Sequence, residues 1–209
     1  MERQHSGLGE ENKMKQEELL SEEIGESEIK PYTHLPMPKP TSKSLEFSAR
    51  EIESDFRLSC RQFREKHPKG WHGIVAGSIR RGLERVHDLD VVLVMEREEL
   101  IGPIKDFFRQ KTTPWHCDYR ICTEKNKGAM LLYLTGDKTH NIAMRYQAAQ
   151  KGLMLNEYGL WGRVHASLEN RFLVGDEERK IYERLGLCYL RPSERSFRLT
   201  RQDHLEVLR

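Results

Sequence analysis

The chain lacks several features that would place it in a particular class of protein. It has 209 residues and no run of about 18 apolar residues, which argues against a membrane-spanning helix. Its first 20 residues hold no apolar stretch and are too acidic for a transit peptide. Its four cysteines form no C-x-x-C pair, so a zinc ribbon, a thioredoxin motif and a disulfide scaffold lose support. We therefore expect an intracellular protein, cytoplasmic or nuclear, that has no membrane contact.

Charge is distributed unevenly along a chain whose overall net charge is +2. Residues 1–30 contain nine Glu, no Asp and four Lys or Arg, so they carry −5 and the remainder of the chain carries +7. A basic body suits a polyanion such as nucleic acid, although an ordinary solvated surface explains the same excess.

Residues 1–44 lack the composition that a folded core requires. The first 30 are rich in Glu and poor in aromatic residues, and residues 31–40 hold four of the eight prolines. Such a segment buries too little apolar surface to offset its ordering entropy, and proline favours extended backbone. We predict a disordered acidic tail followed by a Pro-rich linker, and the tail is a candidate contact for a protein partner.

Hydrophobic periodicity predicts alternating helices and strands in the rest of the chain. Apolar residues from Phe47 to Phe63 recur at helical spacing, and Ser48 with Glu51 forms a capping-box pattern at the start of this helix. Further helices are predicted at 77–85, 98–109, 135–151 and 176–185, and strands at 71–76, 89–95, 115–122 and 129–134. We therefore expect an α+β (α/β) fold with a small mixed sheet and flanking helices.

Two carboxylates stand at the head of the predicted strand 89–95. Asp88 and Asp90 point to the same side, about 7 Å apart, because alternate strand residues share a face. Such a pair repels unless a cation such as Mg²⁺ lies between the two groups. If the later strand that carries Asp118 is a neighbour, three carboxylates converge, which is the minimum for two divalent ions. Taken alone, an Asp-x-Asp pair is more simply a solvated strand end.

A Gly-Ser turn lies about ten residues before this pair. Gly77 and Ser78 open a predicted helix, where backbone N–H groups and a hydroxyl suit phosphate oxygens. Arg80 and Arg81 follow, and guanidinium groups bind phosphates through two parallel hydrogen bonds. The turn and the carboxylates together indicate chemistry on a phosphorylated substrate.

The segment GSIRRGLERVHDLDVVLV resembles the GSxRRG…DxD signature of family X DNA polymerases, the polymerase beta-like nucleotidyltransferases. Two later segments, LLYLTGDKTHNIAMRYQAAQKGLMLNEYGLWG and DEERKIYERLGLCYLRPSER, resemble further motifs of that family in the same order. The likeness runs from about Phe63 to Arg195. It implies a catalytic nucleotidyltransferase palm at residues 45–127 and a small α+β nucleotide-binding/thumb subdomain at 128–209.

The resemblance also implies roles for individual residues, although most of them singly have an ordinary structural explanation. Asp88, Asp90 and Asp118 would be the catalytic ligands of two Mg²⁺ ions, with Mn²⁺ as a substitute. The residues implied in nucleotide binding are Gly77, Ser78, Arg81, Tyr133, Gly136 and Asn141. Those implied in template contact or closure are Arg120, Arg145, Asn156, Glu157 and Tyr158.

Two positions depart from the family pattern, and several arginines have further expected roles. Asp137 replaces the usual Ser and adds negative charge near the nucleotide, and Leu134 replaces the usual Phe beside the sugar. Arg80 is expected to support the local structure. Four cations near the C-terminus are expected to bind DNA: Arg191, Arg195, Arg198 and Arg201.

The implied function is DNA-directed DNA polymerisation, in which dNMP from a dNTP is added to the 3′-hydroxyl of a primer-template or gapped DNA. Two-metal phosphoryl transfer would be the mechanism, and short gap-filling in DNA repair the setting. One alternative is a nucleotidyltransferase that acts without a DNA template or on an RNA or other acceptor. A second alternative is an inactive nucleic-acid-binding module.

Overall fold

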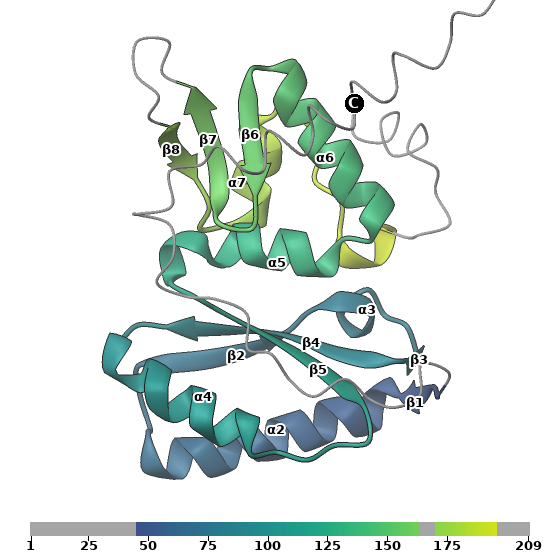
Figure 1. The fold of residues 1–209 in the computed structure, drawn as a ribbon. Helices are drawn as coiled ribbons and strands as arrows, with labels where there is room; N and C mark the ends of the chain where they lie inside the picture. Colours follow the sequence, from purple (N-terminus) through teal and green to yellow (C-terminus); the bar gives the residue numbers. More distant parts are fainter. Residues whose placement is uncertain (1–44, 164–169, 196–209) are drawn as a thin grey trace, which may run out of the picture.

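The computed structural model describes residues 45–163 and 170–195, which form two lobes stacked one above the other (Figure 1). The lower lobe contains β1 (Phe47–Ser48), α2 (Ala49–Lys66), β2 (Trp71–Val75), α3 (Gly77–Arg80), β3 (Arg85–Val86), β4 (Asp88–Met95), η1 (Glu98–Leu100), α4 (Ile101–Arg109) and β5 (His116–Cys122). The upper lobe contains η2 (Glu124–Asn126), α5 (Lys127–Thr135), α6 (Lys138–Gln150), β6 (Leu153–Asn156), β7 (Gly159–Arg163), β8 (Asn170–Val174), α7 (Glu178–Arg184) and η3 (Pro192–Glu194). The predicted α+β class is confirmed.

A three-stranded mixed sheet in the order β2-β4-β5 organises the lower lobe. The central strand β4 runs antiparallel to β2 and parallel to β5. Leu89, Val91 and Leu93 of β4 belong to the core formed with α2 and α4, whereas Val92 and Val94 pack with residues of α5. Because side chains alternate along a strand, Asp88 and Asp90 lie on the face that meets the upper lobe.

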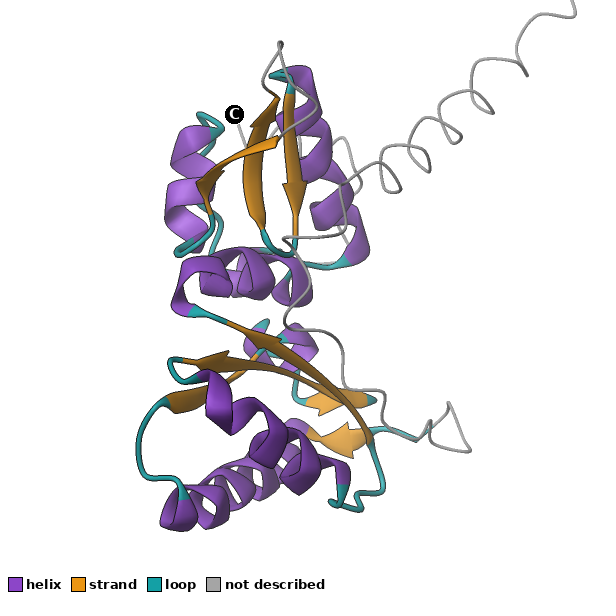
Figure 2. Ribbon diagram, turned by 60° about the vertical axis from the view of Figure 1, so that its left-hand side comes forward, coloured by secondary structure: helices purple, strands orange, loops and turns teal. Residues whose placement is uncertain are grey.

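Helices α2 and α4 cover the other face of this sheet (Figures 1 and 2). Their buried aromatic residues form a continuous cluster, in which the ring of Phe108 lies 6.0 Å from that of Phe56 and 4.7 Å from that of Tyr119. Helix α2 ends before Pro68, where the indole N–H of Trp71 donates to the carbonyl of His67 at 2.8 Å. The lower lobe thus rests on a packed aromatic core.

The upper lobe combines α5, α6 and α7 with the antiparallel sheet β6-β7-β8. Helix α5 lies between this lobe and the lower sheet, and it is buried on several sides (Figure 2). Its Met130 and Leu131 pack toward the lower sheet, while Ala129 and Leu132 join the core of the upper lobe. Helix α5 therefore connects the two cores.

Three of the local predictions differ from the structure. Residues 129–134 form part of α5 rather than a strand, because a short helix buried all round shows an apolar run without helical periodicity. The capping box is not formed either: Ser48 precedes α2 but its side chain makes no capping hydrogen bond, and the N–H of Ala49 donates to the carbonyl of Glu84. The predicted helix 77–85 shortens to the single turn α3.

The predicted tail and linker, residues 1–44, lie outside the described residues. Of the helices in the part that is described, none combines the length and the apolar character needed to cross a bilayer.

Replacing Phe108 with Ala should test the aromatic core of the lower lobe. Removal of this fully buried ring leaves a cavity, so the free energy of unfolding should fall by about 3–5 kcal/mol. Urea denaturation measures the loss, and Leu45→Ala, at a position that is 59% exposed, is the matched control. A loss below about 1 kcal/mol for Phe108→Ala would contradict the packing described.

Candidate active site

Three carboxylates meet on the face of the lower sheet that is turned toward the upper lobe. Asp90 of β4 and Asp118 of β5 are direct register partners in the parallel pair, and Asp88 lies two residues earlier on the same face as Asp90. The convergence predicted from the sequence therefore occurs, because β4 and β5 are neighbours. All three side chains remain partly exposed, so a ligand can reach them.

The negative charges of Asp88, Asp90 and Asp118 are incompletely neutralised by their surroundings. Burial, followed by the negative charges of Asp88 and Asp118, raises the pKa of Asp90 from 3.8 to about 7. Carboxylate oxygens are the ligands that Mg²⁺ and similar hard cations prefer. The donor set and its charge therefore fit a divalent cation.

A glycine allows the turn before α3 to approach these carboxylates. Gly77 adopts φ +59°, in the left-handed region, and a Cβ at this position would lie 1.9 Å from Oδ2 of Asp90. The preceding N–H, of Ala76, donates to the carbonyl of Asp90 at 2.8 Å. Any other residue type at position 77 would displace Asp90. The close approach of the Gly-Ser turn to the carboxylates therefore requires glycine at this position.

Arg81 faces the same group of carboxylates from the end of this turn. Burial lowers the pKa of its guanidinium, while the negative charges of Asp137, Asp90 and Asp88 oppose that shift. Its Nη1 donates to the carbonyl of Thr135 at 2.8 Å, and its buried Nε has no hydrogen-bond partner among the described residues. Ser78 is partly exposed one turn earlier. The predicted phosphate-binding residues thus lie beside the carboxylates.

Arg120 forms a two-point ion pair with Asp118. Its Nε donates to Oδ1 at 3.0 Å and its Nη2 donates to Oδ2 at 3.2 Å. Burial opposes the charged form of Arg120, but the hydrogen bond and charge of Asp118 outweigh it and raise the pKa of the guanidinium. Both carboxylate oxygens of Asp118 therefore accept hydrogen bonds from Arg120 in this conformation. A ligand that binds Asp118 would compete with Arg120 for these oxygens.

The side chains of Tyr133, Asn141 and Arg145 gather at a small pocket where α5 meets α6 and β6. Asn141 Nδ2 donates to the carbonyl of Tyr133 at 2.7 Å, and the guanidinium of Arg145 lies over the Tyr133 ring at 5.4 Å. Asn156 lines the same pocket. Tyr133 lies on α5 and not on the predicted strand. Its contact with a nucleotide stays a prediction.

Asn156, Glu157 and Tyr158 form the turn between β6 and β7. The Asn156 carbonyl oxygen Oδ1 accepts hydrogen bonds from the N–H of Tyr158 at 3.0 Å, the N–H of Gly159 at 3.1 Å and the indole N–H of Trp161 at 3.1 Å. Asn156 thus organises the turn. Glu157 lies close enough to Arg120 to contribute to the rise in its pKa, which connects the turn to the carboxylate group.

Asp137 has a structural role that the sequence reading missed. Its side chain caps α6 by accepting the N–H of His140 at 2.8 Å, and the His140 ring meets Tyr182 Oη of α7 at 2.7 Å. The preceding residue, Gly136, leaves no room for a side chain, because a Cβ there would lie 2.6 Å from the His140 ring. Asp137 is therefore a helix cap, and its charge lies near Arg81.

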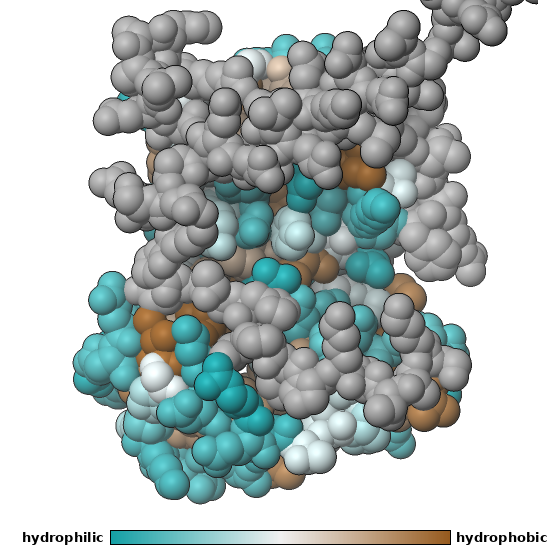
Figure 3. All heavy atoms as spheres, in the orientation of Figure 1, coloured by the Kyte–Doolittle hydropathy of each residue, from teal (hydrophilic) through white to brown (hydrophobic). Residues whose placement is uncertain are grey.

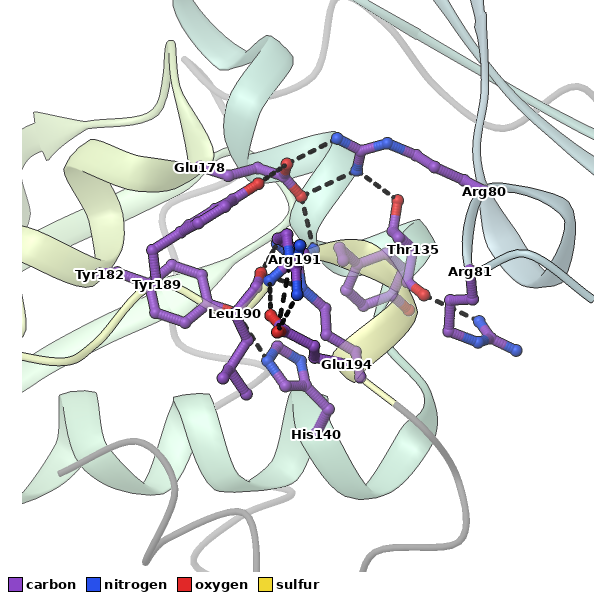
Figure 4. Close-up of polar contacts among 12 residues, drawn as sticks. Arg80, Arg81, Thr135, His140, Glu178, Tyr182, Tyr189, Leu190, Arg191 and Glu194 are labelled. Atoms are coloured by element: carbon purple, nitrogen blue, oxygen red, sulfur yellow. Dashed lines mark hydrogen bonds and ion pairs between the residues drawn. The ribbon is translucent and has the colours of Figure 1, made fainter.

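A buried ion-pair network connects the two lobes at Arg80 (Figure 4). Arg80 donates to both oxygens of Glu178 at 2.9 and 2.7 Å and to Thr135 Oγ1 at 2.7 Å. Arg195, which is fully buried, donates to Glu178 at 2.6 Å and to the carbonyl of Leu190. Burial acts in the opposite direction, yet Arg80 and Arg195 together lower the pKa of Glu178.

This network corrects two expectations. Arg80 does not merely support local structure, since its partner Glu178 lies 98 residues away. Arg195 is not available to bind DNA, because it is buried and paired. Arg191 is exposed and ion-paired with Glu194, and Arg198 and Arg201 lie outside the described residues. No local pattern indicates that Glu178 joins Arg80, because the contact depends on tertiary structure.

Another group of ligand-type side chains lies at the opposite end of the lower sheet. His72, Glu96 and Glu124 bring their ligand atoms within 4.8 Å of one another. Both glutamates are exposed, and Glu124 is ion-paired with Lys127. We assign no cation to this group.

Parts of the chain match known proteins. Residues 130–196 match the family model described as the DNA polymerase beta thumb. The chain is 31% identical to DNA polymerase/3'-5' exonuclease PolX of Bacillus subtilis over 137 residues, which are 57% of this chain and 23% of that protein. It is 35% identical to DNA polymerase IV of Saccharomyces cerevisiae over 79 residues, which are 38% of this chain and 12% of that protein.

A third relative is DNA nucleotidylexotransferase of Eulemur macaco, which is 31% identical over 80 residues, or 38% of this chain and 15% of that protein. The chain thus spans less than a quarter of the length of each of these relatives.

Replacing Glu178 with Ala should destabilise the protein strongly. The change leaves Arg80 and Arg195 without their shared carboxylate, and breaking a buried ion pair on one side costs about 3–5 kcal/mol. Chemical denaturation measures the change, and the exposed neighbour Glu177→Ala serves as the control. Equal stability of the two variants would show that the network contributes little.

Replacing Asp90 with Asn should stabilise the metal-free protein at pH 8. Because the folded state raises the pKa of Asp90 to about 7, stability falls as pH rises from about 4 to 7, by at most about 4 kcal/mol. The variant should therefore melt at a higher temperature than wild type at pH 8 and at a similar temperature at pH 4. Exposed Asp106→Asn is the control.

In the same melts, Mg²⁺ should stabilise wild type at pH 8 and have a much smaller effect on Asp90→Asn. A lower melting temperature of Asp90→Asn at pH 8 without metal would contradict the electrostatic account.

Proposed function

We propose that this chain, which is related to the family X DNA polymerases, is a DNA-directed nucleotidyltransferase. It would add dNMP from a dNTP to the 3′-hydroxyl of a primer-template or gapped DNA. The observation that carries this proposal is the register pairing of Asp90 with Asp118. It brings three carboxylates together beside a Gly-Ser turn that Gly77 holds against Asp90.

The division of labour follows the arrangement of the two lobes. Residues 45–127 would form the catalytic palm, and residues 128–209 the nucleotide-binding/thumb subdomain. Asp88, Asp90 and Asp118 would hold two divalent ions, most simply Mg²⁺. When bound, these ions would supply charge neutralisation at the triphosphate and a lower pKa for the attacking 3′-hydroxyl.

The remaining site residues would bind and orient the substrates. Ser78 and Arg81 would hold the triphosphate, and the buried Nε of Arg81 offers an N–H donor that no described residue accepts. Tyr133 and Asn141 would contact the sugar and base of the nucleotide at the pocket beside α6, and Arg145 would contact the template. Positioning of this kind is the protein's main contribution to phosphoryl transfer.

Arg120 would control the availability of Asp118. In the structure it engages both carboxylate oxygens, and it also lies near Glu157 of the β6–β7 turn. Transfer of Arg120 toward Glu157 would release Asp118 for the primer end. Asn156, Glu157 and Tyr158 would thereby take part in closure. Short gap-filling repair in the cytoplasm or nucleus is the setting that we propose.

The DNA nucleotidylexotransferase relative favours a second candidate function, transfer to a DNA end without a template. One extension assay separates the two. A duplex with a one-nucleotide gap and the same primer without template are each supplied with dNTPs and with NTPs. Template-directed polymerisation predicts that extension requires the template and the matching dNTP, whereas the second function predicts extension of the free primer.

The variant Asp118→Asn should lose incorporation in this assay while nucleotide binding stays measurable. The expected loss of rate is about 10²-fold or more, the scale of losing one charge-stabilising group in an active site. Asp106→Asn, at an exposed position of α4, provides the matched control. Primer extension by Asp118→Asn at close to the wild-type rate would refute the assignment.

A further inference from the structure

Four arginines form a stripe along α2. Arg50, Arg57, Arg61 and Arg64 are all exposed and are separated by 7, 4 and 3 residues, so they recur close to whole turns of the helix. Ile52, Phe56 and Phe63 of the same helix are buried against the lower sheet, on a different side of α2. With a rise of 1.5 Å per residue, the stripe extends over roughly 21 Å.

The charge of this arginine stripe is only partly balanced within the described residues. Arg57 donates to Glu53 at 2.7 Å, and the guanidinium of Arg64 lies over the Trp71 ring at 5.3 Å. Arg50 and Arg61 form no ion pair with any residue that the structure describes. Glu65 stands four residues after Arg61, a spacing that allows an ion pair in a helix, but the two side chains form none.

The arrangement works against the stability of the helix taken alone. Arg57 with Arg61, and Arg61 with Arg64, are like charges at i,i+4 and i,i+3, which destabilise a helix. The other carboxylates early in α2, Glu51 and Asp55, project from a different side of the helix. Glu53 and Glu65 are on the same side of α2 as the four arginines, so this side carries a net positive charge, as expected of a surface that meets an external polyanion.

The stripe lies on the far side of the lower sheet from the candidate active site. Leu89 and Val91 face α2 while Asp88 and Asp90 face the upper lobe, so the sheet separates the arginines from the carboxylates. Helices α2 and α4 form the outer layer of the lower lobe, and hydrophilic side chains cover most of this part of the molecule in Figure 3. DNA held at the carboxylates therefore does not occupy the stripe with the same stretch of backbone.

We propose that the arginine stripe is a second DNA-contact surface, which binds the phosphate backbone of duplex DNA outside the stretch held at the active site. This inference rests on the proposed function for the identity of the polyanion. Guanidinium groups match phosphate oxygens through paired N–H donors, which favours phosphates over a generic anion. A contact made only to phosphates is independent of base sequence and sensitive to salt.

The stripe is long enough to meet several phosphates of a duplex. Duplex DNA carries one negative charge per about 1.7 Å of its axis, so a rigid row of roughly 21 Å meets many phosphates along about six base pairs. Contact by Arg50, Arg57 and Arg61 would displace a corresponding number of condensed counterions. The salt dependence of binding therefore reports directly on the stripe.

The test uses the full chain and a 40-base-pair duplex that contains a one-nucleotide gap. The triple variant Arg50→Gln, Arg57→Gln, Arg61→Gln is compared with a control that also loses three charges, Arg97→Gln, Lys180→Gln, Arg184→Gln, at exposed positions elsewhere. We measure the DNA association constant from 50 to 200 mM salt. Each lost phosphate contact should reduce the slope of log K against log salt by about 0.9.

The stripe variant should therefore lose about 2–3 from this slope, and its affinity at 50 mM salt should fall about tenfold or more. The control should change neither quantity to that extent. Thermal melting of each variant verifies folding, and single-turnover incorporation at saturating DNA should be unchanged because the stripe is remote from the carboxylates. An unchanged slope in the stripe variant would overturn the inference.

Two further outcomes are distinguishable. If the stripe binds the chain's own acidic residues 1–30 instead of DNA, the slope of the stripe variant will equal that of the control, which also overturns the inference. If the stripe variant loses about 2–3 from the slope but wild type incorporates no nucleotide, the proposed function fails while the DNA-contact surface stands.

Discussion

The pairing of β4 with β5 is the constraint on which the candidate site depends. Parallel register places Asp90 directly opposite Asp118, and strand alternation adds Asp88 to the same face. The fold thereby concentrates negative charge, and the raised pKa of Asp90 is the direct consequence. The surroundings only partly compensate: Arg120 neutralises Asp118 by a two-point ion pair, and Arg81 faces the group from the turn. The negative charge of the three carboxylates is thus only partly neutralised by Arg81 and Arg120, and the remaining negative charge suits a divalent cation.

The lobes are joined by polar contacts as well as by the apolar packing of α5. Glu178 binds Arg80 of the lower lobe and Arg195 of the chain beyond α7, and loss of Glu178 is costly because it leaves the fully buried Arg195 without a carboxylate. Arg80 and Arg81 follow Ser78, so the Gly-Ser turn and the connection between the lobes are adjacent in the chain. If the turn binds phosphate as proposed, a shift of α3 on binding would reach the upper lobe through Arg80.

Much of this arrangement could be predicted from the sequence, and the exceptions have physical causes. The Asp88/Asp90 pair, the Gly-Ser turn and the helices at 49–66 and 138–150 follow from local patterns, and family motifs indicated the residues around them. Helix α5 was mistaken for a strand because burial on several sides removes its periodicity. The DNA contact expected of Arg195 is wrong because a sequence does not show that one cation is buried, and the helix cap formed by Asp137 adds to its expected role as a negative charge. The roles inferred for the site residues remain predictions.

Thr135 has a mechanical consequence for the molecule. Two successive residues grip it, Arg80 through the hydroxyl and Arg81 through the carbonyl, just before Gly136 interrupts the helical path. Thr135 is therefore fixed to the lower lobe through both its side chain and its backbone. Any displacement of the end of α5 from α3 would break both hydrogen bonds at once, so these contacts make the junction between α5 and α6 resistant to shear.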